Sequence, residues 1–119
     1  MEMNNNQIDY TAKGRVFLGA VENGEIKLTP LGFEFEYSNR RIGKNLNFPW
    51  HTIVKVELDV SLRGKVGSQF GLYLNTNSKI RFSSKDSGAI LKRIGQQIGT
   101  DKLVRSRSLL APLMDGLKL

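Results

Sequence analysis

The chain contains no cysteine and only one histidine, His51, among its 119 residues. The absence of cysteine excludes disulfides, a catalytic thiolate and zinc sites with sulfur ligands. The single histidine lacks the further ligands of a metal site and the serine and acidic partners of a nucleophilic triad. We therefore expect a protein without enzymatic activity, metal or cofactor.

Long apolar runs are also missing. No segment approaches the roughly 20 apolar residues that cross a bilayer as a helix. The first nine residues, MEMNNNQID, are polar and contain no apolar core of a signal peptide. We expect a cytoplasmic protein that begins with a disordered leader at residues 1–7.

Acidic residues are scarce in the second half of the chain, which makes the charge uneven. The formal net charge is +7. Residues 1–60 contain seven Lys or Arg and eight Asp or Glu, whereas residues 61–119 contain eleven and three. This imbalance favours an acidic partner, which is a nucleic acid, an anionic membrane surface or an acidic protein patch. A solvated, soluble surface accounts for it about equally well.

Alternating apolar and polar residues dominate residues 8–83 and predict short, half-buried strands. Every second residue is apolar in FEFEY at residues 33–37 and in VKVELDV at residues 54–60. Asn23-Gly24 lies between two apolar runs, which is the strongest short signal for a hairpin, so we expect the first hairpin tip at Glu22–Glu25. About seven such strands at regular spacing indicate a mainly β (α+β) fold with an antiparallel barrel or sandwich.

One helix follows the strands. Ile90, Leu91, Ile94 and Ile98 recur with helical spacing and Gly99 suits a C-terminal cap, so this helix would cover the sheet or plug a barrel end. We predict one domain over residues 8–99. Residues 100–119 then form an extension, first basic and later apolar, with a further short helix. Two positions stay open for the extension, on its own domain or on a partner.

Three local features are candidates for chemistry. The pairs Glu34/Glu36 and Glu57/Asp59 each share one strand face, a spacing that two acid–base groups could use. Both pairs occupy the polar side of a clean alternation, which indicates a solvated face. The segment GKVGS at residues 64–68 lacks the spacing of a phosphate-binding loop and fits a turn. Trp50, at a strand entrance, is interpreted as a core or rim anchor and not as a platform for a ligand.

Five segments carry a resemblance to a known family: KGRVFLG, GFEFEYSNRR, FPWHTIVKV, FSSKDSGAILKRI and DKLVRSRSLL. They resemble domain-of-unknown-function family 956, whose members are small cytoplasmic proteins of Gram-positive bacteria, encoded in operons for mannose-family sugar phosphotransferase permeases. The order of the strands and the helix is similar to pleckstrin-homology-like domains of the GRAM-like branch. The resemblance implies an antiparallel barrel of about seven strands closed by a C-terminal helix, and an accessory or regulatory role beside the permease. It implies no catalytic or binding residues.

The leading hypothesis is a non-enzymatic module at the inner face of the membrane that binds the permease or its phosphocarrier subunits and modulates sugar uptake. The expected contact residues are basic groups of one loop and of the tail, and apolar groups of the tail: Arg40, Arg41, Lys44, Lys102, Arg105, Arg107, Leu109, Leu110 and Leu113. The apolar tail could also contact a second copy in a homo-oligomer.

Two alternatives stay open. A nucleic-acid-binding regulator of the mannose operon would use the basic half, although no recognition helix or base-stacking platform is evident in the sequence. An anionic-lipid-binding module is the other alternative. The acidic tip expected at Glu22–Glu25 would repel lipid headgroups and argues against it.

Overall fold

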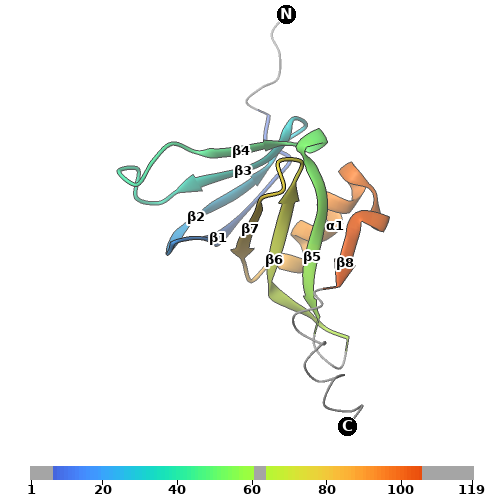
Figure 1. The fold of residues 1–119 in the computed structure, drawn as a ribbon. Helices are drawn as coiled ribbons and strands as arrows, with labels where there is room; N and C mark the ends of the chain where they lie inside the picture. Colours follow the sequence, from blue (N-terminus) through green and yellow to red (C-terminus); the bar gives the residue numbers. More distant parts are fainter. Residues whose placement is uncertain (1–6, 61–63, 106–119) are drawn as a thin grey trace, which may run out of the picture.

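The computed structural model describes residues 7–60 and 64–105, and their strands form one sheet (Figure 1). The elements in chain order are β1 (Tyr10–Leu18), β2 (Ala20–Leu28), β3 (Gly32–Tyr37), β4 (Leu46–Pro49), the 3-10 turn η1 (Trp50–Thr52), β5 (Ile53–Val60), β6 (Val66–Leu74), β7 (Lys79–Ser83), α1 (Ser87–Ile98), the 3-10 turn η2 (Thr100–Lys102) and β8 (Leu103–Arg105). The expectation of a mainly β fold with one amphipathic helix is confirmed for the described residues.

The sheet is open, with the strand order β4-β3-β2-β1-β7-β6-β5-β8. All neighbouring strands are antiparallel except β5 and β8, which are parallel. No pairing joins the edge strands β4 and β8 in the described part of the chain, so the predicted closed barrel of about seven strands is wrong. The eighth strand arises because the chain turns at Gly99 and η2 and brings Leu103 beside Val56.

One face of the sheet carries an aromatic core that α1 covers. Phe33, Phe35, Phe70 and Phe82 are fully buried, and the ring centroids of Phe33 and Phe82 are 4.8 Å apart. The helix adds Ile90, Leu91 and Ile94 to this core, as its spacing predicted. It ends at Gly99, whose positive φ of 106° and N–H···O bond to Gly95 make it the expected C-terminal cap.

The first hairpin turns at Gly19 and not at Asn23-Gly24, so the predicted tip is wrong. The register pairs Leu18 with Ala20 and Tyr10 with Leu28, and Gly19 has a φ of 80°. Gly24 is buried inside β2, where the carbonyl oxygen of Glu36 and the ring of Phe35 occupy the space that a Cβ would need. The glycine is therefore required for the close approach of β3 and not for a turn.

This register changes the chemistry of the hairpin tip. The residues at the turn are Leu18, Gly19 and Ala20, followed by Val21. Leu18 and Val21 expose 47% and 54% of their surface. The tip is therefore apolar, and the argument that an acidic tip repels lipid headgroups does not hold.

The interpretation of Trp50 as an anchor is confirmed. Its ring packs against the core, and its Nε1–H donates to the carbonyl oxygen of Thr29 at 2.9 Å. The Thr29 hydroxyl in turn accepts the N–H groups of Leu31 and Gly32 and so fixes the β2–β3 turn. His51 is exposed.

Part of the expected C-terminal extension belongs to the sheet. Thr100–Arg105 form η2 and β8, and the side chain of Leu103 packs against the core. The further short helix was predicted beyond residue 105 and lies outside the described residues. None of the helices in the described ranges is long and apolar enough to cross a membrane.

Candidate functional site

A groove of about 990 Å³ lies between the β1–β2 hairpin, the end of β3 and the β7–α1 connection. We call it the basic groove. The charged side chains that line it are Lys13, Arg15, Glu25, Glu36, Arg40, Lys85 and Asp86. Its lining therefore contains four cations and three carboxylates.

The strand register assembles these cations from three distant segments. Lys13 and Arg15 alternate on the outer face of β1, and Arg15 pairs with Ser83 at the end of β7. The hydroxyl of Ser84 donates to the carbonyl oxygen of Lys13 at 2.7 Å and accepts the N–H of Asp86. This clamp holds the β7–α1 connection, with Lys85, against β1.

One of the three carboxylates of the lining is already neutralised. Glu36 binds Lys27 at 2.5 Å and Arg40 at 2.6 Å. The hydrogen bond from Lys27 lowers the pKa of the Glu36 carboxyl, and the same bond raises the pKa of Lys27. Lys13 and Lys85 have no ion-pair partner within the part of the chain that the structure describes. With Arg15, these cations outnumber by one the two other carboxylates of the lining, Glu25 and Asp86, and give the groove its net positive charge.

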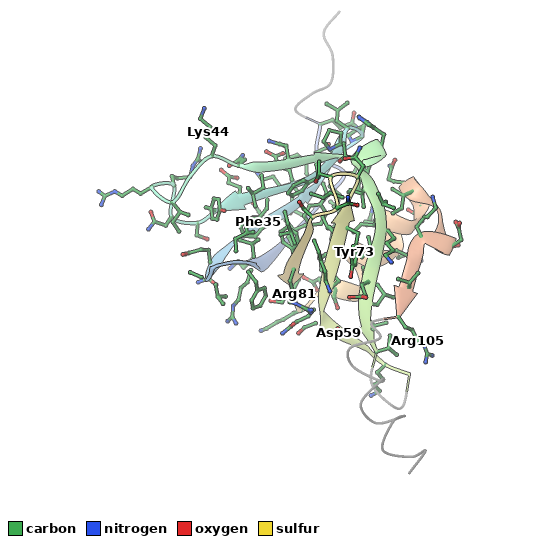
Figure 2. The ribbon with its side chains drawn as sticks, in the orientation of Figure 1. Phe35, Lys44, Asp59, Tyr73, Arg81 and Arg105 are labelled. Atoms are coloured by element: carbon green, nitrogen blue, oxygen red, sulfur yellow. The ribbon has the colours of Figure 1, made fainter. Side chains whose placement is uncertain are left out.

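The outer face of β5, β6 and β7 is instead charge-paired. Lys79 binds Glu57 at 2.6 Å, and Arg81 lies 3.7 Å from Asp59 (Figure 2). The hydrogen bond that Lys79 donates to Glu57 raises the pKa of Lys79. The ammonium group of Lys79 also lies 5.2 Å from the ring centroid of Tyr73. The Glu57/Asp59 pair thus faces cross-strand cations on the outer side of the sheet, and its side chains expose 14% and 26% of their surface, less than the solvated face that the sequence predicted.

The other carboxylate pair is also occupied. Glu34 accepts a hydrogen bond from the side-chain amide of Asn45 at 2.9 Å, and Glu36 has its two cations. No group of three or more His, Cys, Asp or Glu that could hold a metal occurs in residues 7–60 and 64–105.

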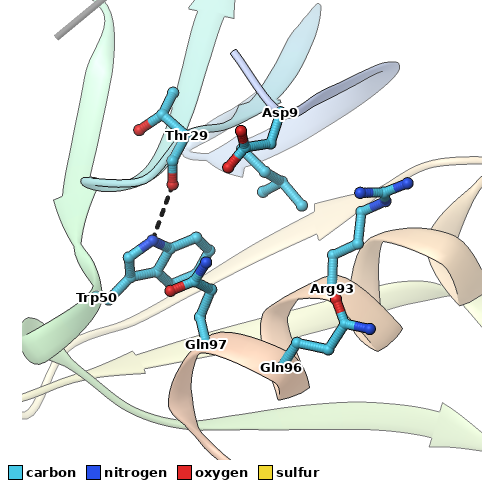
Figure 3. A pocket seen from close by; sticks show the side chains of 7 residues that line it. Asp9, Thr29, Trp50, Arg93, Gln96 and Gln97 are labelled. Atoms are coloured by element: carbon cyan, nitrogen blue, oxygen red, sulfur yellow. Dashed lines mark hydrogen bonds between the residues drawn. The ribbon is translucent and has the colours of Figure 1, made fainter. Parts of the chain in front are cut away.

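A smaller cleft of about 280 Å³ lies where α1 meets the start of β1 and the β2–β3 turn (Figure 3). Its lining is Asp9, Leu28, Thr29, Trp50, Arg93, Gln96 and Gln97. The guanidinium of Arg93 lies 4.5 Å from the ring centroid of Tyr10, and the indole N–H of Trp50 is bound to Thr29. Two of its polar groups therefore already have partners in the fold.

The model of the family described as "Domain of unknown function (DUF956)" matches residues 1–117. The chain belongs to the DUF956 family. No protein with a curated description matches it.

Solved structures of other proteins share the fold of this DUF956 chain. The C-terminal domain of an unknown protein from Leishmania infantum has a TM-score of 0.66 at 12% identity, over 77% of this chain and 84% of that one. The Spt16D Pob3N heterodimer has a TM-score of 0.60 at 11% identity, over 84% of this chain and 56% of that one. Inner membrane complex sub-compartment protein 3 of Toxoplasma gondii has a TM-score of 0.58 at 16% identity, over 78% of this chain and 77% of that one. At these identities the likeness shows the fold alone.

The structure separates the basic contact residues that the sequence grouped together. Arg40, Arg41 and Lys44 lie in the loop between β3 and β4, while Lys102 lies in η2 and Arg105 ends β8. Lys44 and Arg105 mark opposite sides of the molecule in Figure 2. The remaining expected contacts lie outside the described residues: Arg107, Leu109, Leu110 and Leu113.

Sequence reasoning missed Lys13, Arg15 and Lys85 as members of one site. The alternation of Lys13 and Arg15 along one strand was a usable signal for a basic strand face. Lys85 carried no such signal, because only the pairing of β1 with β7 brings it to that face.

Proposed function

We propose that this DUF956 protein is a non-catalytic accessory module that binds a mannose-family phosphotransferase permease at the cytosolic face of the membrane and modulates sugar uptake. The module is a GRAM-like variant of the pleckstrin-homology-like fold, opened along one edge. The permease is proposed from the resemblance to proteins encoded beside such permeases. The binding site is proposed from the basic groove.

The observation that carries the proposal is the available positive charge in the groove. Lys13 on β1 and Lys85 in the adjoining β7–α1 connection have no ion pair among the described residues, while Glu36 on β3 is neutralised by Lys27 and Arg40. The volume of about 990 Å³ lies at the upper end of ordinary ligand pockets. Such a groove fits an acidic segment of the permease or of a phosphocarrier subunit, and complementary charge would speed their encounter.

The test is co-sedimentation of the full chain with phosphatidylcholine vesicles prepared with and without the permease. We expect the protein to pellet only when the permease is present. The double variant Lys13→Glu/Lys85→Glu should lose this association, because it places two carboxylates where the acidic segment binds. Lys92→Glu is the matched control, since Lys92 is an exposed cation on α1 outside the groove.

Two results would overturn the proposal. Equal pelleting from both kinds of vesicle would exclude the permease as the specific partner. Equal association of the double variant and the unchanged chain would exclude the groove as the contact.

A further inference from the structure

Exposed apolar side chains gather at the end of the sheet where the first hairpin turns. Leu18 and Val21 flank the turn at Gly19, and Ile42 in the β3–β4 loop exposes 40% of its surface. The pairing of Gly24 with Tyr37 places the start of β2 and the end of β3 at the same end of the sheet. Figure 1 shows the hairpin and the loop both projecting on the left, the loop above the hairpin. We call residues 15–23 and 38–45 the hairpin end.

The same end is strongly basic. The hairpin end contains four Lys or Arg and one Glu, and two of the cations, Arg15 and Arg40, also line the basic groove. Arg15, Arg41 and Lys44 are exposed and have no ion pair among residues 7–60 and 64–105. The single acid, Glu22, is half-buried in β2.

The opposite end of the same strands gives the contrast. Leu31 in the β2–β3 turn exposes 54% of its surface, as much as Val21. Residues 28–33, LTPLGF, contain no charged residue. Apolar exposure alone is common on protein surfaces, so the association of exposed apolar groups with cations is what distinguishes the hairpin end.

We infer that the hairpin end contacts a bilayer containing anionic phospholipid. Leu18, Val21 and Ile42 would enter the boundary between headgroups and acyl chains. Arg15, Arg41 and Lys44 would lie among the phosphates, where the negative surface potential attracts cations. The charge complementarity favours this occupant over an apolar protein surface, which would leave the cations unpaired. The inference goes beyond the proposed function, because a bilayer without any permease satisfies it.

The experiment measures binding of the full chain to protein-free vesicles. One set contains phosphatidylcholine alone, and the other contains phosphatidylcholine mixed with phosphatidylglycerol. We expect binding to the mixed vesicles only, weakening as salt rises. Arg41→Gln/Lys44→Gln should weaken it about fivefold for each cation removed. Leu18→Ser/Val21→Ser should weaken it about tenfold, because two apolar side chains no longer leave water.

Two controls have the same exposure or charge but lie elsewhere. Leu31→Ser and Lys92→Gln should bind as the unchanged chain does. All four variants alter exposed side chains, and a thermal unfolding curve of each verifies that it is folded. Absence of binding to the mixed vesicles at low salt overturns the inference. Binding that the hairpin-end variants leave unchanged, or that Leu31→Ser weakens as much, overturns the assignment to this surface.

The vesicle result and the permease result fail independently. Permease-dependent pelleting without binding to protein-free mixed vesicles would retain the proposed function and exclude the bilayer contact. Binding to protein-free mixed vesicles without permease-dependent pelleting from phosphatidylcholine vesicles would retain the bilayer contact and exclude the proposed function.

Discussion

The position of the first turn decides which residues the hairpin presents to a partner, and Gly24 tests it. Gly24 lies inside β2 opposite Gly14, with the carbonyl oxygen of Glu36 and the ring of Phe35 against its Cα. An alanine methyl at this position would overlap a backbone oxygen. That oxygen can move only if the pairing of β2 with β3 shifts.

The expected loss of stability in Gly24→Ala follows from overpacking. Extra methyl groups in a packed site cost about 1–3 kcal/mol, and a clash with backbone belongs at the upper end. We therefore expect Gly24→Ala to lower the free energy of unfolding by about 3 kcal/mol. For a domain of this size the loss corresponds to a fall of about 12 °C in Tm. Urea unfolding followed by the fluorescence of Trp50, the only tryptophan, measures the loss.

Two further glycines make the comparison decisive. Gly88 in the first turn of α1 has open space around it, so Gly88→Ala should raise stability by about 0.5–1 kcal/mol. Gly19 also has open space, but its positive φ should make Gly19→Ala cost about 1 kcal/mol. If the turn were at Asn23-Gly24, the order of the two costs would reverse. A loss at Gly24 no larger than that at Gly19 would refute the register, and with it the apolar tip.

Three other changes test the packing and the ion pairs. Phe82→Ala removes a buried ring that lies among three other aromatic rings. It should lower the free energy of unfolding, measured by urea titration, by about 4 kcal/mol. A loss below about 2 kcal/mol would contradict the buried aromatic cluster. Trp50→Phe removes the donor to the Thr29 carbonyl and should cost about 1 kcal/mol by circular dichroism, whereas an unchanged Tm would show that the bond contributes nothing. Because Lys27 lowers the pKa of Glu36, this ion pair stabilises the fold above the ordinary carboxyl pKa of about 4.3 and loses that contribution as the pH falls through the lowered pKa. Glu36→Gln should therefore make the free energy of unfolding depend less on pH in the acid range. An unchanged pH dependence would contradict the role assigned to this pair.

Local patterns predicted those elements whose burial depends on their own sequence. The alternation in β3 placed Phe33 and Phe35 on the core side, and the spacing of Ile90 and Ile94 identified the buried face of α1. Trp50 was identified as an anchor because an indole at a strand entrance can bury its ring and still bond its N–H. Each of these inferences needed only neighbouring residues.

The sequence predictions were wrong where residues distant in the chain determine the local structure. Asn-Gly is compatible with a turn and with a close strand approach, and only the ring of Phe35 on the next strand distinguishes the two cases. Leu103–Arg105 is too short for a strand signal, and it forms β8 because β5 offers a free edge beside it. The closed barrel failed for the same reason, since the sequence contains no local sign of whether two edges meet.

The basic groove could not be predicted from the sequence for the same reason. Its cations come from β1, the segment after β3 and the segment after β7, which are separated by up to about 70 residues in the chain. Sequence inspection grouped cations by loop, and so joined Arg40 with Lys44. The strand pairing joins Arg40 with Lys13 and Lys85 instead.

The two proposed surfaces adjoin along β1 and share Arg15 and Arg40, but Lys13 and Lys85 of the groove lie farther from the hairpin tip. Lys13 in the groove lies five residues from Leu18 at the tip, which is about 17 Å along an extended strand. The Debye length at physiological salt is about 8 Å, so the field of lipid headgroups at the tip decays over about two such lengths before it reaches Lys13. The part of the groove at Lys13 would therefore not be filled by headgroups when the hairpin end rests on the bilayer. It would remain open to an acidic protein segment just above the membrane surface, which is where the cytosolic parts of a permease emerge.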